Sequence, residues 1–407
     1  MANNNENKVL NVPHLRFPEF TDEWKESVLS DFVERVKRKN KNNLCKLPLT
    51  ISAQYGLVDQ ISFFNKVIAS ENMSNYYLLH KGDFAYNKSY SSEYPWGAIK
   101  RLDCYEQGTL SSLYICFKPY SHVSSDFLTH YFETSKWHQG ISEIAVEGAR
   151  NHGLLNVGIQ DFFETRHCLP QSLLEQEKIA KFLNLIEERI ATQNKIIEKY
   201  ESLIQAIIYQ KKTDGMRVKS WQKTELSKVL QERNEKNIGG YVVCSVSVSQ
   251  GVVNQIEYLG RSFAAKETTH YNVVKYGDII YTKSPTGDFP YGIVKRSCIK
   301  KSVAVSPLYG VYKPICDSIG VILHFYFMQP SNAFNYLHPL IQKGAKNTIN
   351  ITNERFLKNS IPLPKAENEA IYIANTLISI QKKIDMEKKM LRSYEKEKQY
   401  LLSKMFI

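Results

Sequence analysis

The chain has 407 residues, of which 43% are hydrophobic and 23% charged, a composition typical of folded globular domains and not of disordered segments. Its net charge of +12 favours a polyanionic partner such as nucleic acid. No apolar run is long enough to span a membrane and the opening MANNNENK is polar, so we expect a cytoplasmic protein without membrane association. The seven cysteines include no Cys-x-x-Cys pair, which favours reduced thiols over a disulfide framework or a zinc site.

The first predicted domain spans residues 1–168 and is rich in glycine, aromatic and β-branched residues. Runs such as LYICF (113–117) predict strands, and SSDFLTHYFETSKWHQGI (124–141) predicts helix. In KGDFAYNKS (81–89), Gly82 and Asp83 predict a turn, and the alternation of Phe84 and Tyr86 with Ala85 predicts a half-buried strand. We therefore expect a mixed α/β domain, whose strand order does not follow from the sequence.

A long helix is predicted next, over 169–213, where no glycine or proline follows Pro170. Its apolar residues are spaced alternately by four and three positions, which is the seam of a coiled coil. The seam residues are Ile179, Leu183, Ile186, Ile190, Ile197 and Ile204, with Gln193 at one seam position.

The second half of the chain repeats the first. KGDFAYNKS returns as YGDIIYTKS (276–284), with five of nine positions identical at an offset of 195 residues. YPWGAIKR (94–101) matches FPYGIVKR (289–296), and GARN (148–151) matches GAKN (344–347). A single recurring turn would not keep this register, so we predict two copies of one unit. The second copy has a domain over 214–362 and a helix over 363–407, with seam residues Ile373, Leu377, Ile380, Ile384, Leu391 and Leu401.

The two predicted helices are longer than a small domain, so each needs another long helix to cover its seam. We expect them to pair as an antiparallel two-helix coiled coil related by a pseudo-twofold axis, holding two globular heads apart. Gln193 and Glu387 occupy the same repeat position, where a polar residue lowers stability and specifies register. The alternative is that each helix packs only on its own domain.

No catalytic constellation stands out in the sequence. It contains neither a Walker A loop nor a Gly-x-Gly-x-x-Gly motif after a strand, and His138, His152 and His167 lack metal-ligand spacing. We therefore predict a binding protein and not an enzyme. Two similar but non-identical heads suit a bipartite DNA site, in which each head reads one half and the helices set the gap.

The segment VPHLRFPEFTDEWKESVLSDF (12–32) resembles the opening of type I restriction-modification specificity subunits, and the alternation of domain and helix, twice over, matches the plan of that family. The resemblance implies two target recognition domains that bind double-stranded DNA. It also implies two DNA adenine methyltransferase subunits and two restriction subunits as partners. S-adenosylmethionine, ATP and Mg²⁺ would then be bound by those partners, with no cofactor in this chain. The second copy lacks the Leu-Arg-Phe-Pro preface, which we therefore assign to the chain start and not to base reading.

Candidate DNA contacts follow predicted strands and recur in both copies, because phosphate contacts need basic or hydroxyl side chains at loop positions. They are Lys88, Ser89, Tyr90, Lys100, Arg101, Arg150, Asn151 and His152 in the first copy and Lys283, Ser284, Lys295, Arg296, Lys346 and Asn347 in the second. Lys300 and Lys301 are further candidates, as extra charge in the second copy. Residues shared by both copies suit phosphates, and residues that differ suit bases.

Two competing interpretations come from other classes of protein. One is a coiled-coil scaffold or nucleic-acid-binding protein without base specificity, which would show no preference among random duplexes. The other is a cryptic nucleic-acid enzyme, which would turn over substrate without partners.

Overall fold

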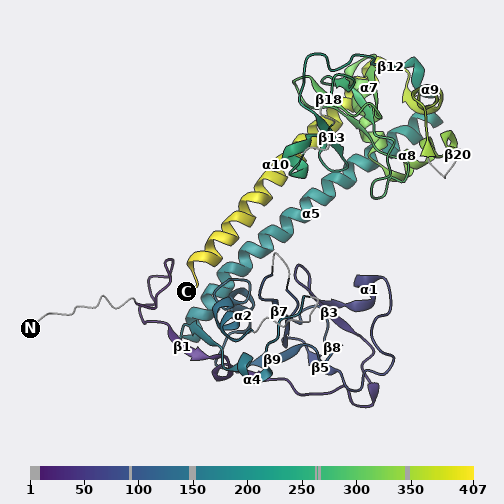
Figure 1. Cartoon of the computed structure of the whole chain (residues 1–407). Helices are drawn as coiled ribbons and strands as arrows, with labels where there is room; N and C mark the ends of the chain where they lie inside the picture. Colours follow the sequence, from purple (N-terminus) through teal and green to yellow (C-terminus); the bar gives the residue numbers. More distant parts are fainter. Residues whose placement is uncertain (1–9, 91–93, 146–152, 262–263, 265–266, 344–348) are drawn as a thin grey trace, which may run out of the picture. The chain divides into compact units, whose positions relative to one another are not determined.

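The computed structural model describes residues 10–407 apart from 91–93, 146–152, 262–263, 265–266 and 344–348. The chain forms two compact units (Figure 1): unit 1 comprises Met1–Thr192 and Leu391–Ile407, and unit 2 comprises Gln193–Met390. Each unit holds one mixed α/β domain and adjoining stretches of two long helices, α5 (Leu173–Arg217) and α10 (Glu367–Lys404). Among the helices of the described ranges, none has both the length and the apolar character that a membrane span requires.

Unit 1 is built on a four-stranded antiparallel sheet in the order β2-β9-β6-β7, with the strand pairs β1-β10, β3-β4 and β5-β8 beside it. Its strands are β1 (Lys25–Val28), β2 (Val33–Arg35), β3 (Leu49–Ser52), β4 (Gly56–Asp59), β5 (Tyr77–His80), β6 (Phe84–Asn87), β7 (Ala98–Arg101), β8 (Gln107–Leu110), β9 (Ile115–Pro119) and β10 (Arg166–Leu169). Its shorter helices are α1 (Gln60–Phe64), α2 (Ser125–Tyr131), α3 (His138–Ile144) and α4 (Ile159–Phe163), and 3-10 turns span Leu29–Asp31 and Lys41–Asn43.

The central strand β6 is buried on both faces. Gly82 has a positive φ of 90° and turns the chain into the strand, as predicted. Phe84, Ala85 and Tyr86 are each 0% exposed, so the prediction of a half-buried strand was wrong. Phe84 and Tyr86 pack into the core that contains α2, α4 and the start of α5, whereas Ala85 packs with Leu79 and its neighbours in a second core on the opposite face.

Unit 2 has the same sheet order, β12-β19-β16-β17, with the pairs β11-β22, β13-β14, β15-β18 and β20-β21. The strands are β11 (Trp221–Glu225), β12 (Leu230–Glu232), β13 (Cys244–Ser247), β14 (Gly251–Asn254), β15 (Asn272–Val274), β16 (Ile279–Tyr281), β17 (Val294–Arg296), β18 (Val303–Val305), β19 (Gly310–Pro314), β20 (Gln342–Lys343), β21 (Ile349–Asn350) and β22 (Ser360–Pro364). The shorter helices are α6 (Gln255–Leu259), α7 (Asp317–Phe327), α8 (Pro330–Leu337) and α9 (Asn353–Lys358), with 3-10 turns at Leu226–Lys228 and His338–Leu340. The predicted internal repeat is therefore confirmed.

An ion pair between a buried aspartate and a partly exposed arginine recurs at the same place in each unit. In unit 1 the carboxylate of Asp83, just before β6, pairs with Arg38. In unit 2 the carboxylate of Asp278, just before β16, accepts two hydrogen bonds from Arg233 at 2.6 and 2.9 Å. Both aspartates are buried, at 5% and 1% exposed, so each needs its arginine to offset the loss of water. The Gly-Asp motif that first disclosed the repeat is therefore part of the scaffold.

The helices α5 and α10 pack against each other in antiparallel directions. In unit 1, Glu187 of α5 pairs with Lys398 of α10 at 2.6 Å. In unit 2, Glu201 pairs with Lys388 at 2.6 Å, so residue numbers rise along α5 as they fall along α10. The predicted seam residues Ile179, Leu183, Ile186, Ile197, Ile204, Ile373, Leu377, Ile380, Ile384 and Leu401 are buried, and Ile190 and Leu391 are partly buried. The prediction of an antiparallel two-helix coiled coil is confirmed.

The two polar seam residues bind each other. The side-chain amide of Gln193 donates to the carboxylate of Glu387, and it also lies 3.3 Å from the Glu387 carbonyl oxygen. Gln193 is only 5% exposed. A shift of one heptad would place each of these groups against an apolar residue and leave it unpaired, so the pair selects one register.

The Leu-Arg-Phe-Pro preface fastens the start of the chain to the long helices within unit 1. Arg16 donates to both carboxylate oxygens of Glu175 at 2.7 and 2.8 Å, and the indole N–H of Trp24 donates to Glu175 at 3.1 Å. Phe17 packs edge-on against Phe182 at 5.9 Å between ring centroids. These contacts give the preface a structural role in unit 1, and its absence from base reading stays a prediction.

A neutral histidine lies inside unit 1. Tyr131 Oη and Thr165 Oγ1 lie 2.9 and 2.8 Å from the two ring nitrogens of His167, and burial lowers the pKa of His167 to about 4. The ordinary pKa of a histidine is 6.5. As the pH falls, the unfolded chain therefore takes up a proton on His167 before the folded chain does. The contribution of neutral His167 to the free energy of unfolding is complete above about pH 6.5. About 3 kcal/mol of it is lost as the pH falls towards 4.

We therefore expect His167→Ile, which introduces the residue found at the matching position Ile361, to flatten the decrease in unfolding free energy between pH 6.5 and 4. Urea unfolding at several pH values measures this slope. Equal slopes for His167→Ile and the natural protein would contradict the assignment.

Candidate nucleic-acid interface

In unit 1 the first group of predicted contacts lies where β6 runs out into a loop. Lys88 is half-buried, and its ammonium donates to the Val157 carbonyl at 3.4 Å. Ser89 and Tyr90 are exposed, and the Tyr90 N–H donates to the carbonyl of Gly153 at 2.9 Å. The loop is therefore held by the segment around Gly153, while its hydroxyl groups face solvent.

The matching loop of unit 2 is held by a close backbone contact. Lys283 has a positive φ of 60° and is half-buried, and burial lowers its pKa. A Cβ at Gly292 would lie 2.9 Å from the Lys283 backbone nitrogen, and Gly292 has a φ of 96°, so only glycine fits there. The next residue, Ser284, is exposed.

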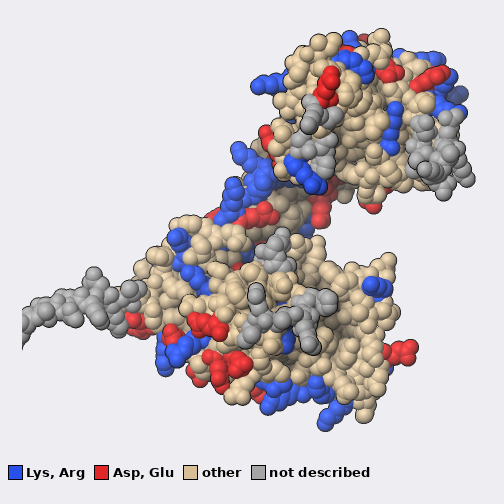
Figure 2. Space-filling model, in the orientation of Figure 1, with Lys and Arg blue, Asp and Glu red and all other residues tan. Residues whose placement is uncertain are grey.

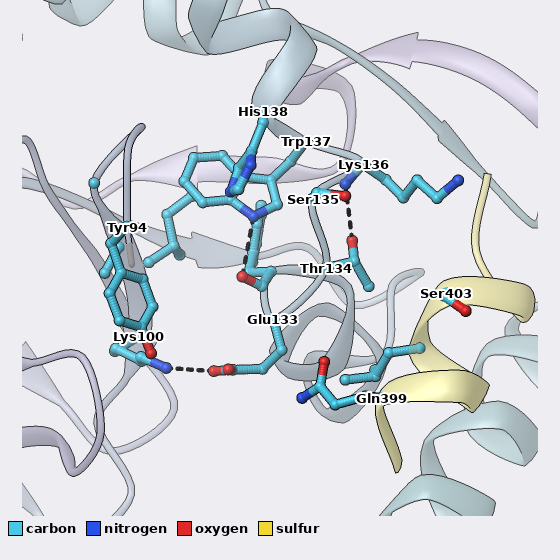
Figure 3. A pocket seen from close by; sticks show the side chains of 15 residues that line it. Tyr94, Lys100, Glu133, Thr134, Ser135, Lys136, Trp137, His138, Gln399 and Ser403 are labelled. Carbon is cyan, nitrogen blue, oxygen red and sulfur yellow. Dashed lines mark hydrogen bonds and ion pairs between the residues drawn. The ribbon is translucent and has the colours of Figure 1, made fainter. Parts of the chain in front are cut away.

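Lys100 and Arg101 of β7 are already paired with carboxylates. Lys100 binds Glu133 at the edge of a pocket of about 370 Å³, where Tyr94 stands beside it and Gln399 and Ser403 of α10 face the same hollow (Figure 3). Arg101 binds Asp103 and Asp126, each at 2.6 Å. A phosphate would have to compete with these carboxylates for either cation.

The corresponding pair in unit 2 does not have the exposure that a phosphate contact requires. Lys295 is 4% exposed and burial lowers its pKa to about 8, while Arg296 is 6% exposed and binds Asp317. The backbone N–H of Arg296 also donates to His324 at 3.2 Å, because α7 packs directly on β17. This burial disfavours both residues as phosphate ligands, and their contact with DNA, expected from the match to Lys100 and Arg101, stays a prediction.

Lys300 and Lys301 are exposed between β17 and β18, as a phosphate contact would need. The remaining candidates lie outside the described residues: Arg150, Asn151, His152, Lys346 and Asn347.

Unit 1 also has a basic segment that is not among the predicted contacts. Residues 35–41, RVKRKNK, carry five basic residues in seven. Lys37, Lys41 and nearby Lys46 are exposed, and the described part of the chain offers none of them a carboxylate partner. Figure 2 shows Lys and Arg side chains gathered along the lower edge of unit 1. A simple count of charges in a moving window would have found this segment.

The described residues offer exposed cations and hydroxyls on loops, which suits contact with a polyanion. Among those residues there is no group of three or more His, Cys, Asp or Glu side chains that could hold a metal ion.

Comparison with known proteins identifies the fold. No protein-family model matches the sequence, and no curated protein sequence matches it significantly. The crystal structure of a type I restriction-modification system S subunit from M. genitalium has 12% identity and a TM-score of 0.56, covering 97% of this chain and 99% of that one. A structure of type I R-M complex assembly (14%, TM-score 0.47, covering 94% and 97%) and the HsdS subunit from Thermoanaerobacter tengcongensis (15%, TM-score 0.42, covering 97% and 98%) also align. The chain therefore has the fold of a type I restriction-modification S subunit.

Proposed function

We propose that this chain is the DNA sequence-specificity subunit of a type I restriction-modification complex. Each α/β domain reads one half of a bipartite DNA target, and the antiparallel helices set the gap between the halves. The observation that carries the proposal is the duplication itself: two domains of identical sheet order differ in their loops and are joined through one paired set of long helices, in a fold shared with an S subunit.

In this proposal the chemistry belongs to partner subunits. Two adenine methyltransferase subunits, which bind S-adenosylmethionine, modify the target, and two restriction subunits, which use ATP and Mg²⁺, cleave unmodified DNA. The chain binds double-stranded DNA in the cytoplasm and directs these partners to it. The net charge of +12 and the exposed basic loops support a DNA partner.

Methylation mapping tests the proposal directly. Cells that express this chain with its methyltransferase should carry methylated adenines in a two-part motif with a constant gap. Loss of the chain should remove that methylation. Methylation without a two-part motif, or the same motif in cells that lack the chain, would reject the proposal, and equal binding to random duplexes would favour the scaffold alternative.

We expect the double change Lys88→Ala and Lys283→Ala to weaken DNA binding to all sequences alike. If each ammonium contacts one phosphate, the slope of log affinity against log salt should fall by about two units. Titrations of labelled duplex at several salt concentrations measure the slope. Lys118→Ala with Lys313→Ala is the matched control, since these two lysines also correspond between the units and lie on β9 and β19. An unchanged slope in the first variant would remove both lysines from the phosphate contacts.

A further inference from the structure

Unit 2 contains a pocket of about 430 Å³ where α7 and α10 begin beside the β11-β22 pair. Val229, Ile319, Leu363 and Ala370 give it apolar walls. Polar and charged residues line it as well, among them Ser318, Lys365 and Glu367.

In unit 1 the two matching positions carry larger side chains. The sequences LPQSLLEQ (169–176) and LPKAENEA (363–370) align at an offset of 194, so Gln176 corresponds to Ala370. The sequences WKESVLSDF (24–32) and WQKTELSKV (221–229) align at an offset of 197, so Phe32 corresponds to Val229. Gln176 and Phe32 are both 3% exposed and thus fill the interior of unit 1. The pocket of unit 2 lies where both of these side chains are replaced by smaller ones.

The side chain of Gln176 shows which chemistry this place accepts. Its carbonyl oxygen accepts from the backbone N–H of Ser124 at 2.8 Å, and Ser124 is the N-cap residue of α2. Its amide nitrogen donates to the carbonyl of Pro170 at 2.9 Å. One carboxamide thus bridges a donor at a helix start and an acceptor in the turn before α5.

The same two kinds of partner border the pocket of unit 2. Cys316, the N-cap residue of α7, contacts the Ser318 hydroxyl with its thiol at 3.2 Å but caps no backbone N–H, so the first turn of α7 presents N–H groups that still need acceptors. Cys316 and Ser318 line the pocket, as does Pro364, the counterpart of Pro170. Lys365 and Glu367 both line it, so the lining charges do not select an anion, and a carboxylate would turn its second oxygen towards the carbonyl of Pro364, where a carboxamide can donate.

We infer that this pocket binds a primary carboxamide carried on a short apolar stem, such as the side chain of a glutamine residue. The carbonyl oxygen of the ligand accepts from the start of α7, its NH₂ group donates towards Pro364, and its stem packs on Val229 and Ala370. The site is separate from the loops assigned to DNA, so its test does not depend on the proposed function.

The probe is butyramide, titrated into the full-length chain and followed by ligand-observed NMR. A ligand of this size should bind with a dissociation constant on the order of millimolar, and the acid butyrate should bind at least tenfold more weakly. Ala370→Gln and Val229→Phe each introduce the side chain of unit 1, and each should weaken butyramide binding at least tenfold. Their thermal unfolding, followed alongside, shows that the loss of binding occurs in a folded protein.

Gln176→Ala combined with Phe32→Val provides the reciprocal test, because the two changes together give unit 1 the smaller side chains of unit 2 and should raise the stoichiometry from one to two. A glutamine residue blocked as N-acetylglutamine N-methylamide distinguishes the sources: if it binds, a protein side chain can fill the site, and if only butyramide binds, the ligand is a small free amide. Butyramide binding that is absent, equal to that of butyrate, or unchanged in both filled variants would overturn the inference.

Discussion

Glu175→Ala should destabilise unit 1 by about 3–5 kcal/mol, because it leaves both the guanidinium of Arg16 and the indole N–H of Trp24 without their acceptor. The Glu175 carboxylate is 2% exposed and the Arg16 side chain 9% exposed, so water cannot replace the lost partner without local opening. The arginine cannot escape this cost by losing its proton, because a guanidinium stays charged in proteins even without its partner.

Unit 2 contains a matched control. Glu369 accepts from Trp221 at 2.8 Å, as Glu175 accepts from Trp24, but the second copy has no preface and hence no arginine at this place. Glu369→Ala should therefore cost only about 1–3 kcal/mol, the penalty for one unpaired N–H. Glu175→Gln, which keeps an acceptor for Trp24 and removes the charge, should fall between the two.

Hydrogen exchange under increasing urea resolves the two units, since β1 and β10 report on unit 1 and β11 and β22 on unit 2. Equal losses for Glu175→Ala and Glu369→Ala would show that the preface arginine adds nothing to the stability of unit 1. A loss from Glu175→Ala that appears equally in both pairs of strands would show that the change is not confined to unit 1.

The features that follow from periodicity could be predicted from the sequence. A seam with alternating spacing has one way to be buried, and two copies of it in one chain supply each other with a partner, so seam residues such as Leu183 and Leu377 lie where the heptads put them. Because the two copies share their sequence pattern, the repeat also predicted that both units have the same sheet order, although not what that order is.

Burial by elements distant in the sequence could not be predicted in this way. The alternation in β6 indicated one buried face, but the hairpin β3-β4 and the strand pair β5-β8 cover the other, and Ala85 is small enough to be buried there. Lys295 and Lys100 match in sequence and differ in surroundings. Lys100 has Glu133, whereas β17 lies under α7, which is longer than α2. Matching residues therefore do not guarantee matching exposure, and the DNA contacts stay a prediction.

The second large effect concerns the gap between the two halves of the proposed DNA target. Deleting residues 197–203 from α5 together with 377–383 from α10 removes one heptad from each helix. It keeps the seam in phase and retains Gln193 and Glu387. Seven residues of helix correspond to about 10 Å at 1.5 Å per residue. That length equals about three base pairs at 3.4 Å each.

Under the proposed function, methylation mapping of cells expressing this variant with its methyltransferase should show the native gap lost and any remaining motif about three base pairs shorter, with both half-sites unchanged. The half-sites should persist because the deletion leaves every residue of the two α/β domains in place. The length control replaces the exposed residues Glu198, Ser202 and Lys382 by alanine without deletion, and should keep the native gap. A deletion variant that still methylates the native motif would show that the helices do not set the gap, whereas altered half-sites would mean that base reading extends onto them.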